Sequence, residues 1–188
     1  MRITGGRRKG MRLRAPADHQ TRPTTDVARK AIFDILAGQV EHARVLDLFA
    51  GSGALGIEAL SRGALEAVFI DSSREACSTI VENLAATGDR GRGIVQRADA
   101  LRFLANRSRP RPEIAFDVAF LDPPYDRGLG FVARILGKLG AGGWIRPGGA
   151  VVVSSATGPV SWPSGFRQTR VRPFGRTQIA VAVRDDDA

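Results

Sequence analysis

The feature that most constrains the fold is a short apolar run that leads through a glycine-rich turn into a helix. Residues 45–49 (VLDLF) are typical of a buried strand, and residues 54–62 have the apolar spacing of a helix. Gly51 and Gly53 lie between the two segments and Gly56 lies in the expected helix, and together they have GxGxxG spacing. A continuous apolar run without polar alternation is typical of a parallel strand covered on both faces. The stretch therefore predicts the strand, turn and helix of an α/β sheet.

The same alternation continues along the chain. Further strands are expected at residues 67–70, 94–96, 115–121 and 150–154, and helices at residues 73–87, 100–106 and 129–139. An earlier helix is expected from the start signal Pro23-Thr24-Thr25 to Gly38. The last two extended segments, near residues 166–171 and 177–183, have no helix between them. This order predicts a doubly wound, Rossmann-like α/β sheet with an antiparallel edge.

Composition excludes several classes of protein. The 188 residues are 43% hydrophobic, which is enough for a single domain with a buried core. Cys77 is the only cysteine, so a disulfide scaffold and a cysteine-based metal site are both excluded. No apolar run approaches the roughly 18 residues of a membrane span, and the N-terminus lacks the apolar stretch of a signal peptide. We therefore expect a cytoplasmic protein without membrane or metal partners.

Positive charge is concentrated at the start of the chain. The net charge is +9, and residues 1–30 hold nine basic and two acidic side chains. Arginine outnumbers lysine by 25 to 3, so composition bias is an alternative explanation, but bias does not explain the clustering. A basic segment on a nearly neutral body indicates contact with a polyanion such as nucleic acid. The candidate contact residues are Arg7, Arg8, Lys9, Arg12, Arg14, Arg22 and Thr24.

Two acidic residues help to distinguish between the possible ligands of the glycine turn. Asp71 lies 20 residues after Gly51 at the end of the next strand, where a carboxylate binds the ribose hydroxyls of an adenosine cofactor. Asp47 would face the pyrophosphate of NAD unfavourably, whereas it can hold the ammonium group of an amino acid. The spacing therefore favours S-adenosylmethionine over NAD. The alternative is that Asp47 only caps the helix.

A third carboxylate, Asp99, follows the third strand. It is placed to accept a hydrogen bond from the adenine amino group. The signal is weak by itself, because an aspartate before a short helix is commonly an N-cap.

The strand at residues 115–121 ends in Asp122-Pro123-Pro124-Tyr125. Two prolines after a buried strand make a rigid turn with few N–H donors, so carbonyl oxygens are left as acceptors. If Asp122 and Pro123 each accept one N–H of a nucleobase amine, its lone pair turns out of conjugation and faces an electrophile. Tyr125 can stack on the base. The alternative is a structural turn in which Asp122 is a cap.

These motifs together resemble those of class I S-adenosylmethionine-dependent methyltransferases that act on exocyclic amines. A narrower resemblance is to the RsmD family of bacterial small-subunit rRNA methyltransferases, and it covers nearly the whole chain. It rests on Ile3-Thr4-Gly5-Gly6, Arg12-x-Arg14, Arg22-Pro23-Thr24-Thr25-Asp26, Arg29, Phe33, the stretch 47–56, and Glu58-Ala59-Leu60-Ser61-Arg62-Gly63. The glycine and DPPY motifs are widely shared, whereas the N-terminal block is more particular.

The resemblance implies a seven-stranded sheet, S-adenosylmethionine as donor, and methylation of N2 of one guanine in 16S rRNA on an assembling small subunit. We expect the enzyme to be a monomer. By position, it assigns cofactor contacts to Asp47, Phe49, Ala50, Gly51, Ser52, Gly53, Asp71, Ser72, Asp99, Ala100 and Asp122. The target base would be held by Asp122, Pro123, Pro124 and Tyr125. One departure is Val153-Ser154-Ser155 in the fifth strand, where an acidic residue is expected.

The expected organisation is a basic N-terminal hairpin (residues 1–22), a methyltransferase domain (23–184) and an acidic tail (185–188). Two other functions remain open on the residues alone. A DNA methyltransferase acting on a base amine would use the same DPPY chemistry, although the chain lacks the length for a separate target-recognition domain. The less favoured alternative is a non-catalytic RNA-binding module.

Overall fold

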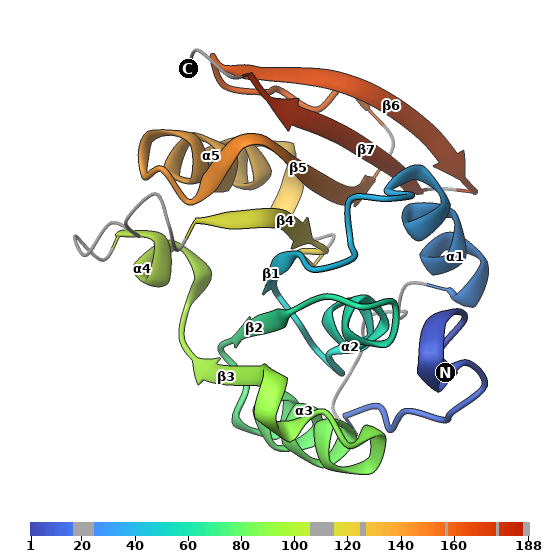
Figure 1. The fold of residues 1–188 in the computed structure, drawn as a ribbon. Coiled ribbons are helices and arrows are strands. Elements are labelled where there is room, and N and C mark those ends of the chain that lie inside the picture. The colour runs from blue at the N-terminus through green and yellow to red at the C-terminus, as the bar shows by residue number, and fades with distance from the viewer. Residues whose placement is uncertain (17–24, 106–114, 125–126, 157, 176, 186–188) are drawn as a thin grey trace.

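A computed structural model describes residues 1–16, 25–105, 115–124, 127–156, 158–175 and 177–185 (Figure 1). The strands are β1 (Arg44–Leu48), β2 (Glu66–Asp71), β3 (Gly93–Arg97), β4 (Phe116–Leu121), β5 (Ile145–Ala156), β6 (Phe166–Phe174) and β7 (Thr177–Arg184). The helices are α1 (Asp26–Ile35), α2 (Ala54–Ser61), α3 (Arg74–Thr87), α4 (Ala100–Ala105) and α5 (Gly128–Ala141), with short 3₁₀ turns η1 (Gly6–Arg8) and η2 (Arg90–Arg92). This is the predicted alternation of strands and helices.

The seven strands form one sheet in the order β3-β2-β1-β4-β5-β7-β6. The first five strands in chain order are parallel, and β7 pairs antiparallel with both β5 and β6. The predicted class I methyltransferase architecture, a mostly parallel sheet with an antiparallel C-terminal hairpin, is therefore confirmed.

Two apolar cores lie on opposite faces of the sheet. Figure 1 shows α1, α2 and α3 on one face, where Ile32, Leu60 and Ile80 join the first core. On the other face, α4 and α5 contribute Leu104 and Leu136 to the second core. Because both faces are covered, the central strands read as continuous apolar runs in the sequence.

The described part of the N-terminal segment, residues 1–16, contains an antiparallel pairing. A single bridge pairs Arg2 with Arg12, and η1 forms the tip in place of regular strands. Ile3 and Leu13 are buried in the core of the α1–α3 face, so the segment is packed on the domain. We call residues 1–14 the N-terminal arm.

The strand order reverses direction beside β1, and this point positions the site. The chain runs outward from β1 through β2 to β3, and then returns to β4 on the other side of β1. In sheets of this kind, ligands bind at the carboxyl ends of the strands beside such a switch point. Asp47 is the last but one residue of β1, and Asp122 directly follows β4.

No helix in the described ranges is long and apolar enough to cross a membrane. Likewise, the described residues contain no group of three or more His, Cys, Asp or Glu side chains that could hold a metal ion.

Candidate active site

The glycine turn after β1 has an unusual backbone. Phe49, Gly51 and Gly53 have φ angles of 65°, 56° and 75°, in the left-handed region. Glycine adopts this region readily, whereas a phenylalanine there is uncommon and is held by its surroundings. The Ala50 N–H donates to the carbonyl of Ile70 at 3.1 Å, which anchors the turn to β2. Backbone strain of this kind clusters at ligand-binding sites.

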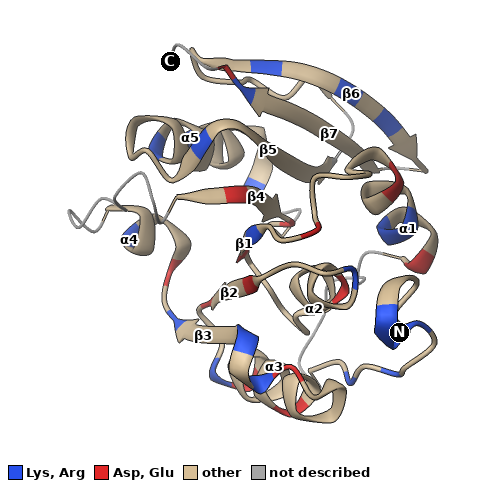
Figure 2. Ribbon diagram, viewed as in Figure 1, with Lys and Arg blue, Asp and Glu red and all other residues tan. Residues whose placement is uncertain are grey.

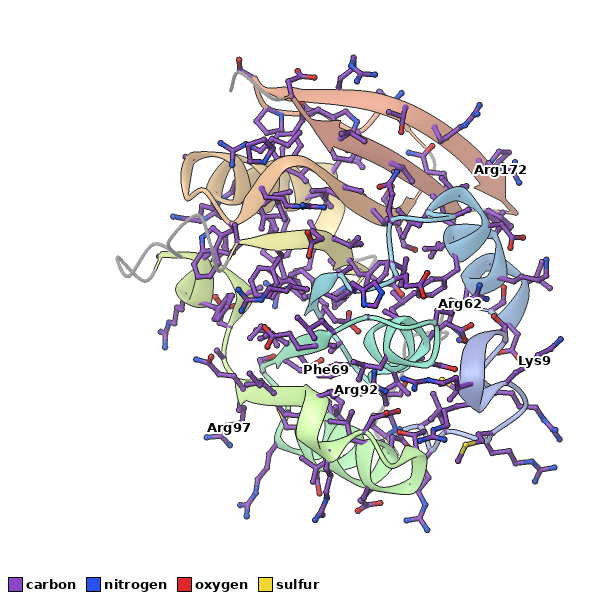
Figure 3. All side chains as sticks on the ribbon, viewed as in Figure 1. Lys9, Arg62, Phe69, Arg92, Arg97 and Arg172 are labelled. Atoms are coloured by element: carbon purple, nitrogen blue, oxygen red, sulfur yellow. The ribbon has the colours of Figure 1, made fainter. Side chains whose placement is uncertain are left out.

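Close packing explains the later glycines. A Cβ on Gly53 would lie 3.1 Å from Ile80 of α3, besides requiring the left-handed conformation. A Cβ on Gly56 would lie 2.3 Å from the ring of Phe69, which occupies β2 below α2 (Figure 3). The turn therefore depends on glycine both for its conformation and for seating α2 on the sheet.

Asp47 is a buried carboxylate at the floor of this turn, with 1% of its surface exposed. The Gly56 N–H donates to its Oδ2 at 2.9 Å. The pKa of Asp47 is raised to about 7: burial is the largest cause, the Gly56 hydrogen bond acts in the opposite direction, and the nearby charges of Asp122 and Asp71 add to the increase. The carboxyl ends of β1, β2 and β4 thus converge on one anionic site.

An anionic site of this kind fits a cation and disfavours a pyrophosphate. S-adenosylmethionine carries positive charge on its sulfur and its amino group, so the residues present fit this cofactor. Asp47 is the residue that would hold the charged amino-acid portion.

Asp71 is oriented by the backbone of two loops. Its Oδ2 accepts from the Gly51 N–H and its Oδ1 from the Ser73 N–H, both at 2.8 Å. Each carboxylate oxygen keeps a second lone pair for a further donor such as a ribose hydroxyl. Ser72, the next residue, is exposed beside it.

Asp99 and Ala100 lie at the next strand end. The Asp99 Oδ1 accepts from the Arg102 N–H at 3.0 Å, so this carboxylate caps α4. Asp99 is exposed and Ala100 is buried. Asp71 and Asp99 therefore lie at the ends of neighbouring strands, although the structure gives Asp99 a capping role of its own.

The segment after β4 has the expected shortage of donors. Asp122 is half-buried, Pro123 is buried and Pro124 is exposed. The Arg127 N–H donates to the Pro124 carbonyl at 3.1 Å. Tyr125 lies outside the described residues.

Asn83 is a buried site residue that the sequence did not reveal. Its side-chain N–H groups donate to the carbonyls of Ser52 at 2.9 Å and Arg14 at 3.0 Å, and its Oδ1 accepts from the Arg14 N–H at 2.9 Å. Asn83 therefore joins α3, the glycine turn and the N-terminal arm. Its only sequence signal is a polar residue on the buried face of a helix.

The basic residues of the arm are divided between two places. Arg14 is linked to the glycine turn by Asn83, which donates to the carbonyls of both Arg14 and Ser52. Arg12 and Arg14 line a groove of about 370 Å³ beside α3. Arg7, Arg8 and Lys9 lie at the other end of α2, where the Arg8 N–H donates to Ser61 Oγ at 2.9 Å (Figure 3). Helix α2 has eight residues, so these two places are separated by about 12 Å. Arg22 and Thr24 lie outside the described residues.

The fifth strand keeps the departure noted in the sequence. Ser154 and Ser155 are buried near the end of β5. The Gln178 side chain of β7 donates to Ser155 Oγ at 3.4 Å. The described residues at this strand end are thus polar and neutral, in place of an acidic group.

The strand order, the glycine turn and the acidic residues at three strand ends define a class I S-adenosylmethionine-dependent methyltransferase. A family model described as "Conserved hypothetical protein 95" matches residues 1–183. Individual relatives identify the family more narrowly.

The chain is 37% identical over 168 residues to "Ribosomal RNA small subunit methyltransferase D" of Escherichia coli K12, covering 86% of this chain and 81% of that protein. It is 43% identical over 125 residues to "Putative rRNA methyltransferase YlbH" of Bacillus subtilis, covering 66% and 67%. The solved structure of "Putative methyltransferase yhhF" from Escherichia coli matches with a TM-score of 0.87 at 34% identity, covering 99% and 98%. The chain therefore belongs to the RsmD family of S-adenosylmethionine-dependent rRNA methyltransferases.

Proposed function

We propose that the protein transfers a methyl group from S-adenosylmethionine to the exocyclic N2 amine of a guanine in 16S rRNA. The substrate is the rRNA of a small ribosomal subunit or an assembly intermediate, and the enzyme acts as a monomer in the cytoplasm. The observation that carries the proposal is the acceptor-rich segment Asp122-Pro123-Pro124 next to the anionic site of Asp47 and Asp71. The N2 position follows from the resemblance to the RsmD family.

The chemistry divides between two groups of residues. When bound, S-adenosylmethionine supplies a methyl group on a positively charged sulfur. The Asp47 carboxylate would hold the amino-acid portion, Asp71 would hold the ribose, and Asp99 would accept a hydrogen bond from the adenine amine. The backbone of the turn from Phe49 to Gly53 would line the cofactor, because the glycines allow a close approach.

The target amine is activated by acceptors only. The Asp122 carboxylate and the Pro123 carbonyl each accept one N–H, which directs the nitrogen lone pair at the methyl carbon. The amine nitrogen would take up the methyl group that the cofactor supplies from its sulfur, and the Asp122 carboxylate would accept the proton that the amine loses. These acceptors stabilise the positive charge that develops on nitrogen, so they act on the transition state more than on the ground state. Tyr125 stacks on the extruded base.

The N-terminal arm supplies contacts to the RNA backbone. Figure 2 shows basic residues along the arm on the α2 and α3 side of the molecule. Arg7, Lys9 and Arg12 are exposed there. Phosphate contacts of this kind position a nucleic acid without reading its sequence.

The test compares three methyl acceptors: small subunits from cells that lack the enzyme, naked rRNA and duplex DNA. Methyl-labelled S-adenosylmethionine is supplied, and the labelled nucleic acid is digested to nucleosides. We expect label in the subunits and its recovery as N2-methylguanosine. Label in adenine or cytosine of DNA would support the DNA methyltransferase instead, and failure to bind S-adenosylmethionine in calorimetry would favour a non-catalytic RNA-binding module.

A further inference from the structure

The edge strand β6 carries a strongly basic run that the proposed site does not use. Its nine residues, FRQTRVRPF, contain Arg167, Arg170 and Arg172 and no acidic residue. Figure 2 shows these basic positions spaced along β6. All three arginines are exposed.

A β-bulge places the three arginines on one face of the sheet. Arg167 pairs with Val183, and Arg170 and Arg172 pair with Val181 and Ile179. Directly opposed residues share a face, and alternate residues of β7 share a face, so the three arginines project to the same side.

In a regular strand, Arg167 and Arg170 would point to opposite faces, because they are three residues apart. The register shift between Gln168 and Arg170 leaves Thr169 as the extra residue. The Thr169 hydroxyl donates to the Val181 carbonyl at 3.3 Å, which fixes this local geometry. The bulge therefore aligns charges that the spacing alone would separate.

The face that they share is the one covered by α1. Val181 and Ile179 belong to the core of the α1–α3 face. The arginines extend this face beyond α1, and Figure 3 shows Arg172 at the end of β6 next to α1.

The charges are available for a partner. Arg167 lies 3.5 Å from Asp185, and both side chains are largely exposed. Neither the Arg170 nor the Arg172 guanidinium forms a hydrogen bond or ion pair with another residue in the described part of the chain. Charged residues also protect an edge strand from aggregation, but that role does not require them to share one face.

The arginines run toward the catalytic edge. Arg172 pairs with Ile179, which pairs with Ser154 near the carboxyl end of β5. Strand β6 is three strand spacings from β4, which corresponds to about 14 Å. Arg172 therefore lies a short run of nucleotides away from a base held at Asp122.

We infer that Arg167, Arg170 and Arg172 form a second phosphate-binding surface, the β6 arginine stripe, which holds the RNA backbone beside the target guanine. The inference rests on the proposed function, because it takes rRNA as the bound polyanion. The stripe and the N-terminal arm then contact different parts of the RNA, on two sides of the site.

The test measures binding to small subunits, without catalysis, at several salt concentrations. The double variant Arg170→Gln/Arg172→Gln removes two phosphate contacts, which makes the negative slope of log affinity against log salt shallower by about 1.4 for unpaired RNA. Between 50 and 200 mM salt, the wild type should then lose about sevenfold more affinity than the variant. The matched control, Arg134→Gln/Lys138→Gln, removes the same charge from exposed positions of α5 on the other face.

A second variant tests whether the face of β6 on which the arginines lie matters for binding, without changing the net charge. Val171 pairs with Ala180 and therefore faces the opposite side of the sheet, where it is 46% exposed. Arg170→Val/Val171→Arg moves one charge across the strand. We expect the slope to become shallower by about 0.7.

Two outcomes would overturn the stripe. One is a slope in both β6 variants equal to that of the wild type. The other is a slope in the α5 control that becomes shallower by as much as in the β6 double variant. If the wild type methylates rRNA under either outcome, only the stripe is wrong. If the wild type neither binds nor methylates small subunits, the proposed function fails, and the stripe fails with it.

Discussion

Asp47 links the burial of one residue to the charge of the ligand. Its pKa of about 7 means that the folded protein holds a proton that the unfolded chain, with an ordinary value of 3.8, has released. The stability of the free protein therefore falls as the pH rises from about 4 to about 7. A bound cation favours the ionised carboxylate, so S-adenosylmethionine binding offsets this loss.

This coupling predicts a pH-dependent cofactor affinity. Calorimetry should show S-adenosylmethionine binding more tightly as the pH rises toward about 7 and then levelling off, with proton release below that pH. Asp47→Asn should weaken binding and remove the pH dependence, and should raise the Tm at pH 8. Asp34→Asn, at an exposed position of α1, is the control. An affinity for Asp47→Asn that still rises with pH as in the wild type would contradict this role.

At the scale of the element, the strand, turn and helix unit was predictable because each part leaves its own signal. The apolar run of β1 reflects two covered faces, and the glycines reflect left-handed backbone and close packing. The start of β5 was predicted five residues late. Pro147 and Gly148 resemble a turn in the sequence, whereas the strand passes through them with a register shift against β4.

Other parts could not be predicted, because they depend on contacts distant in sequence. Glu58 is fully buried, and its carboxylate accepts from the Thr4 N–H at 2.7 Å and pairs with Arg62 at 2.9 Å. A periodicity analysis does not show that one helical glutamate binds the arm. Asn83 is a similar case. The carboxylates at the strand ends were foreseen because topology alone brings strand ends together.

The close packing of α2 against β2 can be tested by a substitution that adds one methyl group. Gly56→Ala places a Cβ 2.3 Å from the Phe69 ring, and overpacking of this kind destabilises by about 1 to 3 kcal/mol. The matched control is Gly137→Ala in α5, where a Cβ meets nothing within 4 Å. It should stabilise by about 0.5 to 1 kcal/mol, because alanine favours a helix. Thermal unfolding measures both, and equal Tm values for the two variants would contradict the packing argument.

At the scale of the whole molecule, positive charge lies on two sides of the acidic site at the carboxyl ends of the strands. The N-terminal arm lies along α2, and β6 forms the opposite end of the sheet order (Figures 1 and 2). Truncating residues 1–14 would remove the buried Ile3 and Leu13 together with the basic residues. Substitution of exposed charges therefore tests the arm without disturbing the core.

The arm is expected to determine part of the salt dependence of binding. If about five of its side chains contact phosphates of unpaired RNA, they contribute a slope near −3.5. Arg7→Gln/Lys9→Gln/Arg12→Gln should make the slope shallower by about 2, while S-adenosylmethionine affinity stays unchanged. Binding of labelled small subunits at several salt concentrations measures this. An unchanged slope would show that the arm does not hold the RNA.

The central claim is that the amine is methylated at the carboxyl end of β4 by acceptors that include Asp122. The most direct test measures methyl transfer to small subunits and S-adenosylmethionine binding in one preparation of Asp122→Ala, with Asp122→Asn beside it. We predict that methyl transfer is abolished in both variants, whereas the cofactor Kd stays within about tenfold, or about 1.4 kcal/mol, of the wild type. Wild-type methyl transfer by either variant would contradict the claim.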